Sequence, residues 1–208
     1  MKMKKIAALT LALLLLLCFA ACGSEPQTSP ASSTKETSAQ TDASAEMPTA
    51  NGKTLVVYFS ATGTTKGVAE TIAAVEHADL YEIVPAQPYS DADLNWSDSN
   101  SRSTKEQNDK SARPQITSDA VTLDGVDTIY IGYPIWWGEE PRILDTFVEQ
   151  YSFDGITMIP FCTSGGSGIG RSGKNLEELA GSGNWLDGGR LRGGMSESDV
   201  QSWIDGLK

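Results

Sequence analysis

The chain has 208 residues, of which 27 are acidic and 16 are basic, so its formal net charge is −11. A protein this acidic is poorly suited to bind nucleic acid or anionic lipid headgroups, and it favours cationic partners. One histidine and three cysteines are too few for a histidine-rich or multi-cysteine metal site.

The first 21 residues have the pattern of a bacterial export signal. Three lysines within residues 1–5 precede an apolar run at residues 6–21, which is rather short for a membrane-spanning helix. The sequence FAAC at residues 19–22 resembles the lipoprotein signal box, although Phe19 stands where leucine is usual. We expect residues 1–21 to be a lipoprotein signal peptide and Cys22 to be lipidated, which would anchor the exported protein to the extracytoplasmic side of a bacterial membrane. Plain secretion after cleavage before Cys22, or an uncleaved anchor, are the alternatives.

Residues 22–52 are predicted to be a disordered tether that begins with the lipidated cysteine. After that cysteine, Met47 is the only large apolar side chain of the segment. So little apolar surface cannot offset the conformational entropy that ordering would cost. Residues 53–208 remain, and they have the length of one ordinary domain.

Three continuous apolar runs predict buried strands at residues 54–60, 126–134 and 156–162. Because the apolar residues do not alternate with polar ones, each strand is expected to be covered on both faces, as in a parallel sheet. Residues 79–85 mix charges into an apolar run, as an edge strand would. A last short strand is predicted within residues 189–193.

Amphipathic patterns predict four helices that separate these strands. The first helix includes Val68 and Ile72, the second starts with Pro141 as its first helical residue, and a weaker third surrounds Leu176. The last follows a capping box at residues 196–199. Strands that alternate with helices predict an α/β fold with right-handed crossovers and an open, doubly wound sheet.

Residues 86–124 form a long excursion at the place where another helix would be expected. They show no convincing apolar period until their end. A connection of this length is typical of a functional excursion or lid. A surface ornament without a function is the alternative.

The loop SATGTT, residues 60–65, connects the first predicted strand to the first helix. Its hydroxyl groups come from Ser60, Thr62, Thr64 and Thr65. Gly63 would let the backbone approach a ligand, and the helix N-terminus would favour an anion. The spacing matches neither a Walker-type loop nor a dinucleotide-binding loop. A monophosphate site is one interpretation, and an ordinary capped helix start is the other.

Two more loops are predicted to follow strands at the same edge of the sheet, where open parallel sheets bind ligands. Residues 133–141 contain Trp136 and Trp137, and two adjacent indoles are difficult to explain as core alone because each N–H needs a partner. An aromatic ligand could stack there. Residues 163–173 are so rich in glycine that their backbone is expected to approach something flat or bulky.

Taken together, these loops resemble those of the flavodoxin-like family. The phosphate signature [ST]-x-T-G-x-T is matched at Ser60, Thr62, Gly63 and Thr65. The sequences GYPIWWGEEP, TSGGSGIGRS and DLNWSDSNSRSTKEQND look like those of bacterial lipoproteins and small flavoproteins in that family. The resemblance covers residues 53–208. It implies a five-stranded sheet of order 2-1-3-4-5 and bound FMN.

The resemblance also implies which residues would contact FMN. The phosphate would be bound by Ser60, Thr62, Gly63, Thr64 and Thr65. The isoalloxazine would be flanked by Pro134, Ile135, Trp136, Trp137 and Gly138. Its pyrimidine edge would meet the backbone of Ser164, Gly165, Gly166 and Ser167. Flavodoxins usually cover the outer flavin face with a tyrosine after the fourth strand, but none is present here, so that face is either open or covered by Tyr89 or Trp96.

Three functions are compatible with such a site. The first is a tethered electron carrier, with a redox protein or a small-molecule electron acceptor as its partner and the membrane contacted through the lipid. The second is an FMN-dependent NAD(P)H reductase of quinones, flavins or nitro compounds, and the third is a flavin-binding protein without redox turnover. No catalytic residue is expected, because the only histidine, His77, is predicted at a helix end far from these loops.

Overall fold

The computed structural model describes residues 52–207. The predicted signal peptide, the predicted lipidation site Cys22 and all of the predicted tether except its last residue lie outside this range. The strands are β1 (Lys53–Tyr58), β2 (Asp79–Glu82), β3 (Val126–Pro134), β4 (Thr157–Thr163), β5 (Asn184–Trp185) and β6 (Gly189–Arg190). The helices are α1 (Thr64–Glu76), α2 (Arg102–Asn108), α3 (Arg142–Val148), α4 (Ser172–Ala180) and α5 (Glu197–Asp205).

All strand pairs are parallel, and the order β2-β1-β3-β4-β5 confirms the predicted doubly wound α/β sheet. The last position of the sheet is shared, because β6 also pairs with β4. Gly188 separates β5 from β6, with φ +64° and a backbone that passes so close to Pro160 that a Cβ atom would lie 1.8 Å from its carbonyl oxygen. The last strand predicted at residues 189–193 therefore corresponds to β6 alone. The strand β5, which pairs with the first part of β4, was not predicted.

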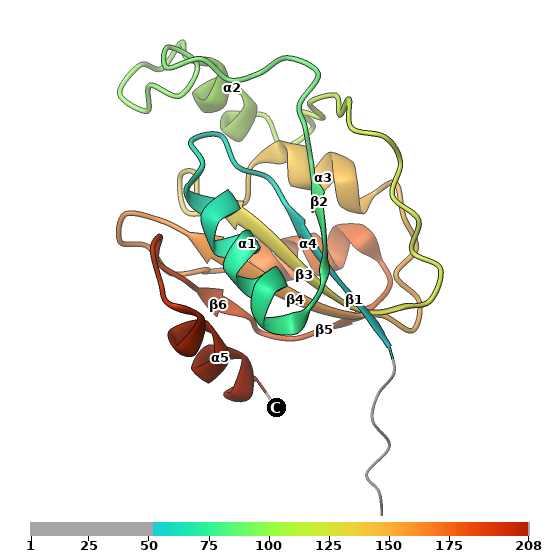
Figure 1. Cartoon of the computed structure of the whole chain (residues 1–208). Helices are drawn as coiled ribbons and strands as arrows, with labels where there is room; N and C mark the ends of the chain where they lie inside the picture. The colour runs from blue at the N-terminus through green and yellow to red at the C-terminus, as the bar shows by residue number, and fades with distance from the viewer. Residues whose placement is uncertain (1–51, 208) are drawn as a thin grey trace, which may run out of the picture. The chain divides into compact units, whose positions relative to one another are not determined.

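The sheet is covered on both faces, as the continuous apolar runs predict. Val56 and Tyr130 face the side on which α1 and α5 pack, whereas Val57 and Ile131 face the side of α3 and α4. Figure 1 shows the two pairs of helices on either side of the sheet. All four of these strand residues are buried. The alternation of faces within single strands accounts for the two hydrophobic cores.

The ends of the helices agree with most of the predictions. Ser196 caps α5, since its hydroxyl accepts a hydrogen bond from the Asp199 amide at 3.2 Å. His77 ends α1 in a left-handed conformation and is exposed. Pro141 is not the first helical residue, contrary to the prediction. It occupies the capping position of α3 with ψ 139°, because an extended residue is needed where the preceding turn enters the helix.

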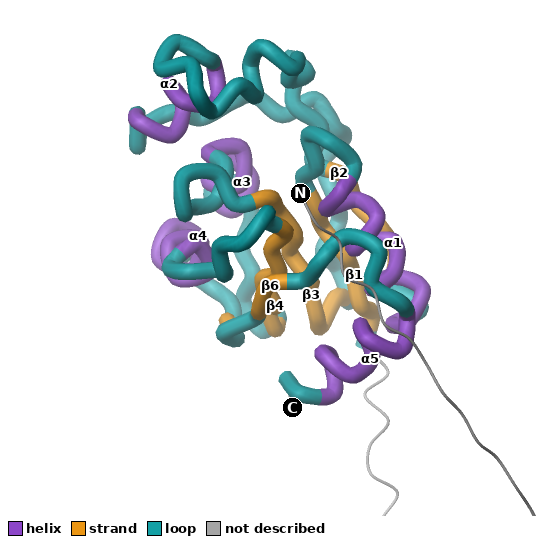
Figure 2. The backbone as a smooth tube through the Cα atoms, turned by 90° about the vertical axis from the view of Figure 1, so that its left-hand side faces the viewer, coloured by secondary structure: helices purple, strands orange, loops and turns teal. Residues whose placement is uncertain are grey.

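The excursion at residues 86–124 contains α2, which the sequence did not predict. Figures 1 and 2 both show α2 and its flanking loops at one end of the molecule, close to α3. One isolated bridge, Pro85 with Ile116, closes the base of the excursion. Within residues 52–207, none of the helices is both long and apolar enough to cross a membrane.

Candidate functional site at the carboxyl ends of β1 and β3

The hydroxyl loop begins α1 without a side-chain cap. Gly63 occupies the capping position with φ 86°, and no side chain bonds the first amides of the helix. Gly63 donates its own N–H to Ser60 Oγ at 3.1 Å, which closes the turn. The first N–H groups of a helix have no partner within the helix, so the amides of this turn remain available to a ligand. The structure therefore does not support the alternative of an ordinary capped helix start.

The threonines of this loop are not equivalent. Thr65 is buried, and its hydroxyl lies 2.8 Å from that of Thr163 at the end of β4. Thr62 and Thr64 are exposed, and within the described residues neither hydroxyl takes part in a hydrogen bond. A hydroxyl that accepts one hydrogen bond can still donate another. All three threonines can thus direct a donor to an anion, with Thr65 held most rigidly.

The tryptophan loop forms a tight turn between β3 and α3. Trp136 and Glu139 exchange two backbone hydrogen bonds, each of 3.0 Å. The two residues between them, Trp137 and Gly138, have φ values of 50° and 84°. Positive φ at both central positions is the pattern of a primed turn, and it is unfavourable for a residue as large as tryptophan. This turn leaves the Trp137 indole 47% exposed.

The Trp136 side chain belongs to an aromatic cluster. Its ring centroid lies 5.7 Å from that of Phe59, just after β1, and 5.1 Å from that of Tyr89 in the excursion. Phe59 and Tyr89 are also in contact, with centroids 5.8 Å apart. All three pairs meet edge to face, a favoured geometry for aromatic rings. The cluster fixes one indole of the pair and joins the excursion to the sheet.

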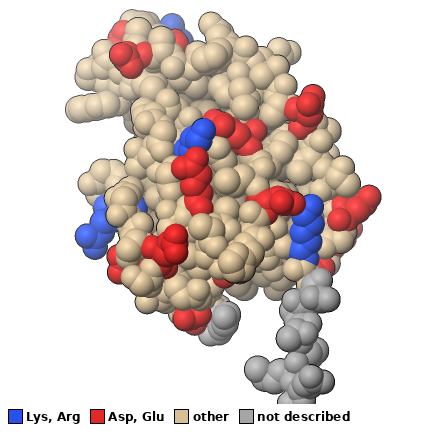
Figure 3. Space-filling view, viewed as in Figure 1, with Lys and Arg blue, Asp and Glu red and all other residues tan. Residues whose placement is uncertain are grey.

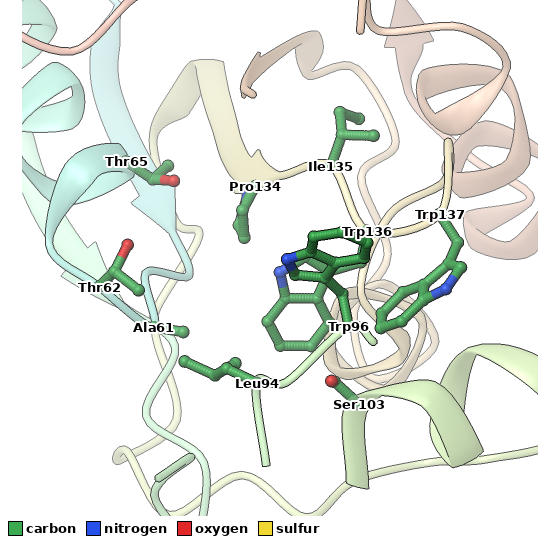
Figure 4. Close-up of a pocket in the computed structure, with 10 residues that line it drawn as sticks. All are labelled: Ala61, Thr62, Thr65, Leu94, Trp96, Ser103, Pro134, Ile135, Trp136 and Trp137. Atoms are coloured by element: carbon green, nitrogen blue, oxygen red, sulfur yellow. The ribbon is translucent and has the colours of Figure 1, made fainter. Parts of the chain in front are cut away.

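A pocket of about 440 Å³ lies between the hydroxyl loop, the tryptophan turn and the excursion. Its lining residues are Ala61, Thr62, Thr65, Leu94, Trp96, Ser103, Pro134, Ile135, Trp136 and Trp137. Figure 4 shows the threonines on one side of this space and the indoles on the other. The pocket thus combines hydroxyl donors with flat apolar walls, which suits a ligand with an anionic group and an aromatic ring.

The excursion forms one wall of this pocket through Leu94, Trp96 and Ser103. Trp96 is 79% exposed, so its indole is free to contact a ligand. Tyr89, the other candidate to cover a flavin, does not line the pocket and packs behind Trp136. These contacts favour a functional excursion over a surface ornament.

The glycine-rich loop lies outside the lining of this pocket. Arg190 of β6 approaches the carbonyl oxygens of Ser164 and Gly166, at 3.4 Å each. The N–H groups of Gly165, Gly166 and Ser167 have no hydrogen-bond partner among residues 52–207. The loop therefore offers backbone donors, but the assignment of residues 164–167 to the ligand remains a prediction.

Several site residues were missed because their burial cannot be read from the sequence. Gln107 of α2 is buried, and its amide donates to the carbonyl oxygens of Trp136 and Glu140 at 3.1 and 3.2 Å. Glu140 is buried as well, and burial raises the pKa of its carboxyl group to about 7. Ser101 caps α2, since its hydroxyl accepts a hydrogen bond from the Thr104 amide, and a serine at this position is a local signal from which the start of the helix could have been predicted.

The fold and the pocket define a ligand-binding α/β protein of the doubly wound class, with its site at the carboxyl ends of the strands. The family model for flavodoxins matches residues 53–207, and the chain belongs to this family. No match was found among curated proteins.

Solved structures include similar proteins. A candidate flavoprotein from Bacteroides eggerthii DSM 20697 is 46% identical over 76% of this chain and 98% of its own, with a TM-score of 0.71. A second one, from Bacteroides uniformis ATCC 8492, is 48% identical over 74% and 98%, with a TM-score of 0.70. A flavoprotein from Lactobacillus acidophilus NCFM, crystallised in complex with FMN, is 27% identical over 74% and 99%, with a TM-score of 0.55.

Proposed function

We propose that the protein binds FMN in the pocket between the hydroxyl loop and the tryptophan turn, and that it acts as an electron carrier. We further propose that a lipid on Cys22 holds it at the outer face of a bacterial membrane. The observation that carries the proposal is the uncapped start of α1, where free hydroxyls and amides adjoin an aromatic-walled pocket. The FMN in the related Lactobacillus acidophilus structure supports the choice of ligand.

The residues present fit FMN. Thr62, Thr65 and the amides after Gly63 would take the phosphate without a cation, since Lys66 points toward Glu82 at 4.0 Å. Trp136 and Trp137 would flank the ring on one side, and Trp96 would contact it from the excursion. The pocket volume is within the range of small-molecule sites, roughly 300–1,000 Å³. Bound FMN would supply transfer of one or two electrons.

The acidic surface supports a carrier with a cationic partner. Figure 3 shows acidic side chains spread over the visible face, with few basic ones among them. Such a charge distribution speeds encounter with a basic redox protein at low ionic strength. The partner would be a redox protein or a small-molecule acceptor that approaches the exposed indoles.

An FMN-dependent NAD(P)H reductase is the second candidate. It is favoured by the exposure of Trp96 and Trp137, which leaves room for a second flat molecule at the pocket mouth. Access to the flavin is the property that separates the two functions, because only the reductase has to admit a nicotinamide to the ring. Hydride transfer from a nicotinamide requires direct contact with the flavin ring.

Anaerobic mixing with a nicotinamide tests the choice between the two functions. The full chain, loaded with FMN, is mixed with NADH or NADPH and the flavin absorbance is followed. A carrier keeps its absorbance for minutes, although chemical reduction with dithionite bleaches it. Rapid bleaching by either nicotinamide would contradict the carrier and establish the reductase.

A further inference from the structure

A group of buried charged side chains lies beside the tryptophan turn, where α2, α3 and α4 meet. Glu140, Arg142 and Asp145 are 1%, 3% and 2% exposed. Burial of charges is costly unless each is paired and hydrogen-bonded. None of the three residues lines the pocket, so direct contact with a ligand does not explain the free-energy cost of burying these charges.

Arg142 connects the two buried carboxyl groups. One of its terminal nitrogens, Nη1, lies 3.3 Å from Glu140 Oε1 and 3.4 Å from Asp145 Oδ2. Asp145 has a second cation, because Arg113 Nη1 lies 3.7 Å from the same oxygen. Glu140 has no second cation among residues 52–207. Arg142 is shared further, because its Nη2 donates to Glu139 Oε2 at 2.6 Å. Three carboxylates that share one guanidinium leave an excess of negative charge at Glu140, the one without a second cation.

One proton removes this excess. Burial and the nearby charge of Asp145 raise the pKa of Glu140 to about 7, and burial raises the pKa of Asp145 to about 6. Asn175 lies 3.2 and 3.1 Å from the two carboxyl oxygens of Glu140. An amide carries both a donor and an acceptor, so Asn175 can partner either protonation state of the carboxyl group.

The cluster is connected to the pocket through Gln107. The side-chain amide of Gln107 donates to the Trp136 and Glu140 carbonyl oxygens, while the backbone carbonyl oxygen of Gln107 accepts from Arg142 at 3.3 Å. The Oε1 atom of Gln107, Arg142 Nε and Asp145 Oδ1 have no hydrogen-bond partner among the described residues. The three hydrogen bonds of Gln107 join α2, and with it the excursion that carries Trp96, to the tryptophan turn.

We propose that Glu140, together with Asp145, is a proton-binding positioning residue for the flavin site. With one proton bound to the pair, the cluster holds α2 and the tryptophan turn in the arrangement that forms the pocket. The inference rests on the proposed function, because its readout is flavin affinity.

The direction of the pH dependence follows from the difference in proton affinity between the closed and the open arrangement. Opening the excursion would expose both carboxyl groups to water and lower their pKa values toward the ordinary range, so the closed arrangement binds the proton more tightly than the open one. Closure, and flavin affinity with it, therefore weakens as the pH rises through about 6 and 7.

The other titratable or charged groups that face the cluster are Asp109, Lys110, Arg113, Tyr133, Glu139, Glu149 and Glu178. The pKa values of Asp109, Glu139 and Glu149 are lowered by their hydrogen bonds, so these three groups stay charged across that range.

The test measures the dissociation constant of riboflavin for the full chain between about pH 5.5 and about pH 8, by quenching of flavin fluorescence. Riboflavin is used because it has no phosphate that would titrate in this range. We expect binding by the wild type to weaken about fivefold or more as the pH rises, the low end of measured site-to-site couplings. Glu140→Gln should bind at pH 8 as tightly as the wild type does at pH 5.5.

Glu178→Gln is the matched control, since Glu178 lies beside the buried cluster, in a surface cavity that Glu140 and Asp145 also line, but its side chain is 58% exposed. It should keep the wild-type profile. Asp145→Asn, measured in parallel, should move the midpoint to lower pH because Glu140 loses a neighbouring negative charge. A wild-type pH profile in Glu140→Gln, or an unmoved midpoint in Asp145→Asn, would overturn the inference. If neither riboflavin nor FMN bound to the wild type at any pH, the proposed function would be refuted, and the inference with it.

Discussion

Three threonines in one loop have different surroundings, and this distinction governs what each contributes to the site. Thr65 contacts Thr163, which lies 98 positions away in the chain, whereas Thr62 and Thr64 are exposed and Thr62 lines the pocket. The motif spacing predicts that the loop binds an anion. The spacing cannot show which of the three threonines is buried. Thr163, the partner of Thr65, is brought near only by the pairing of β3 with β4 and of β3 with β1.

Replacement of the two exposed threonines tests the phosphate assignment. Thr62→Val combined with Thr64→Val should weaken FMN binding by roughly 100-fold or more, since each of the two hydrogen bonds to a charged group contributes about 1.5–3 kcal/mol. Riboflavin affinity should stay within about twofold, because riboflavin lacks the phosphate. Fluorescence titration of both flavins measures the difference. Equal losses for the two ligands would rule out a phosphate at this loop.

The buried threonine, Thr65, should also affect stability. Thr65→Val leaves the Thr163 hydroxyl buried without a partner, so we expect the free energy of unfolding to fall by about 1–3 kcal/mol. Thr62→Val is the control, and its effect should stay within about 0.5 kcal/mol because the residue is exposed. Urea denaturation of both variants measures the two values. An unchanged stability of Thr65→Val would show that the contact with Thr163 contributes nothing.

At the scale of elements, predictability depended on which side chains are buried. The strands β1, β3 and β4 were predicted because their apolar residues are continuous and both faces are covered. The helix α2 was not predicted, because its sequence RSTKEQN has no apolar residue and its buried face consists of Ser103, Thr104 and Gln107. Hydrophobic periodicity cannot reveal a helix that packs through polar contacts.

Gln107 tests how α2 is held. Gln107→Ala removes the donor to two backbone carbonyl groups, those of Trp136 and Glu140, so the free energy of unfolding should fall by about 1–3 kcal/mol. Lys105→Ala, on the exposed face of the same helix, should have little effect. Urea denaturation compares the two variants. If both changes had the same effect, the anchoring role of Gln107 would be wrong.

For the whole molecule, the strand order was predictable and the closure of the pocket was not. Regular alternation of strands and helices restricts the topology to a doubly wound sheet, and the family resemblance implied the order that the structure shows. The position of the excursion depends on side-chain amides and buried charges contributed by α2, α3 and α4, which no local pattern reports. Gln107 and the buried charges behind the tryptophan turn could therefore be identified only in the structure.

The buried carboxyl pair also makes a prediction for the stability of the ligand-free protein. The pKa values of Glu140 and Asp145 are raised, so the stability linked to their protonation is fully present below their ordinary range. It is lost as the pH rises through about 6 and 7. Urea denaturation should give a lower free energy of unfolding at pH 8 than at pH 5.5, and Glu140→Gln should reduce the difference. A stability that increased over this interval would contradict the assignment.

The most direct measurement of the central claim is a titration of FMN with the purified full chain, followed by flavin fluorescence. We predict saturable quenching with one FMN bound per chain, because the free amides of α1 and the aromatic walls of the pocket together match phosphate and ring. A chain that leaves the fluorescence of FMN unchanged at every concentration would contradict the assignment of this pocket as a flavin site.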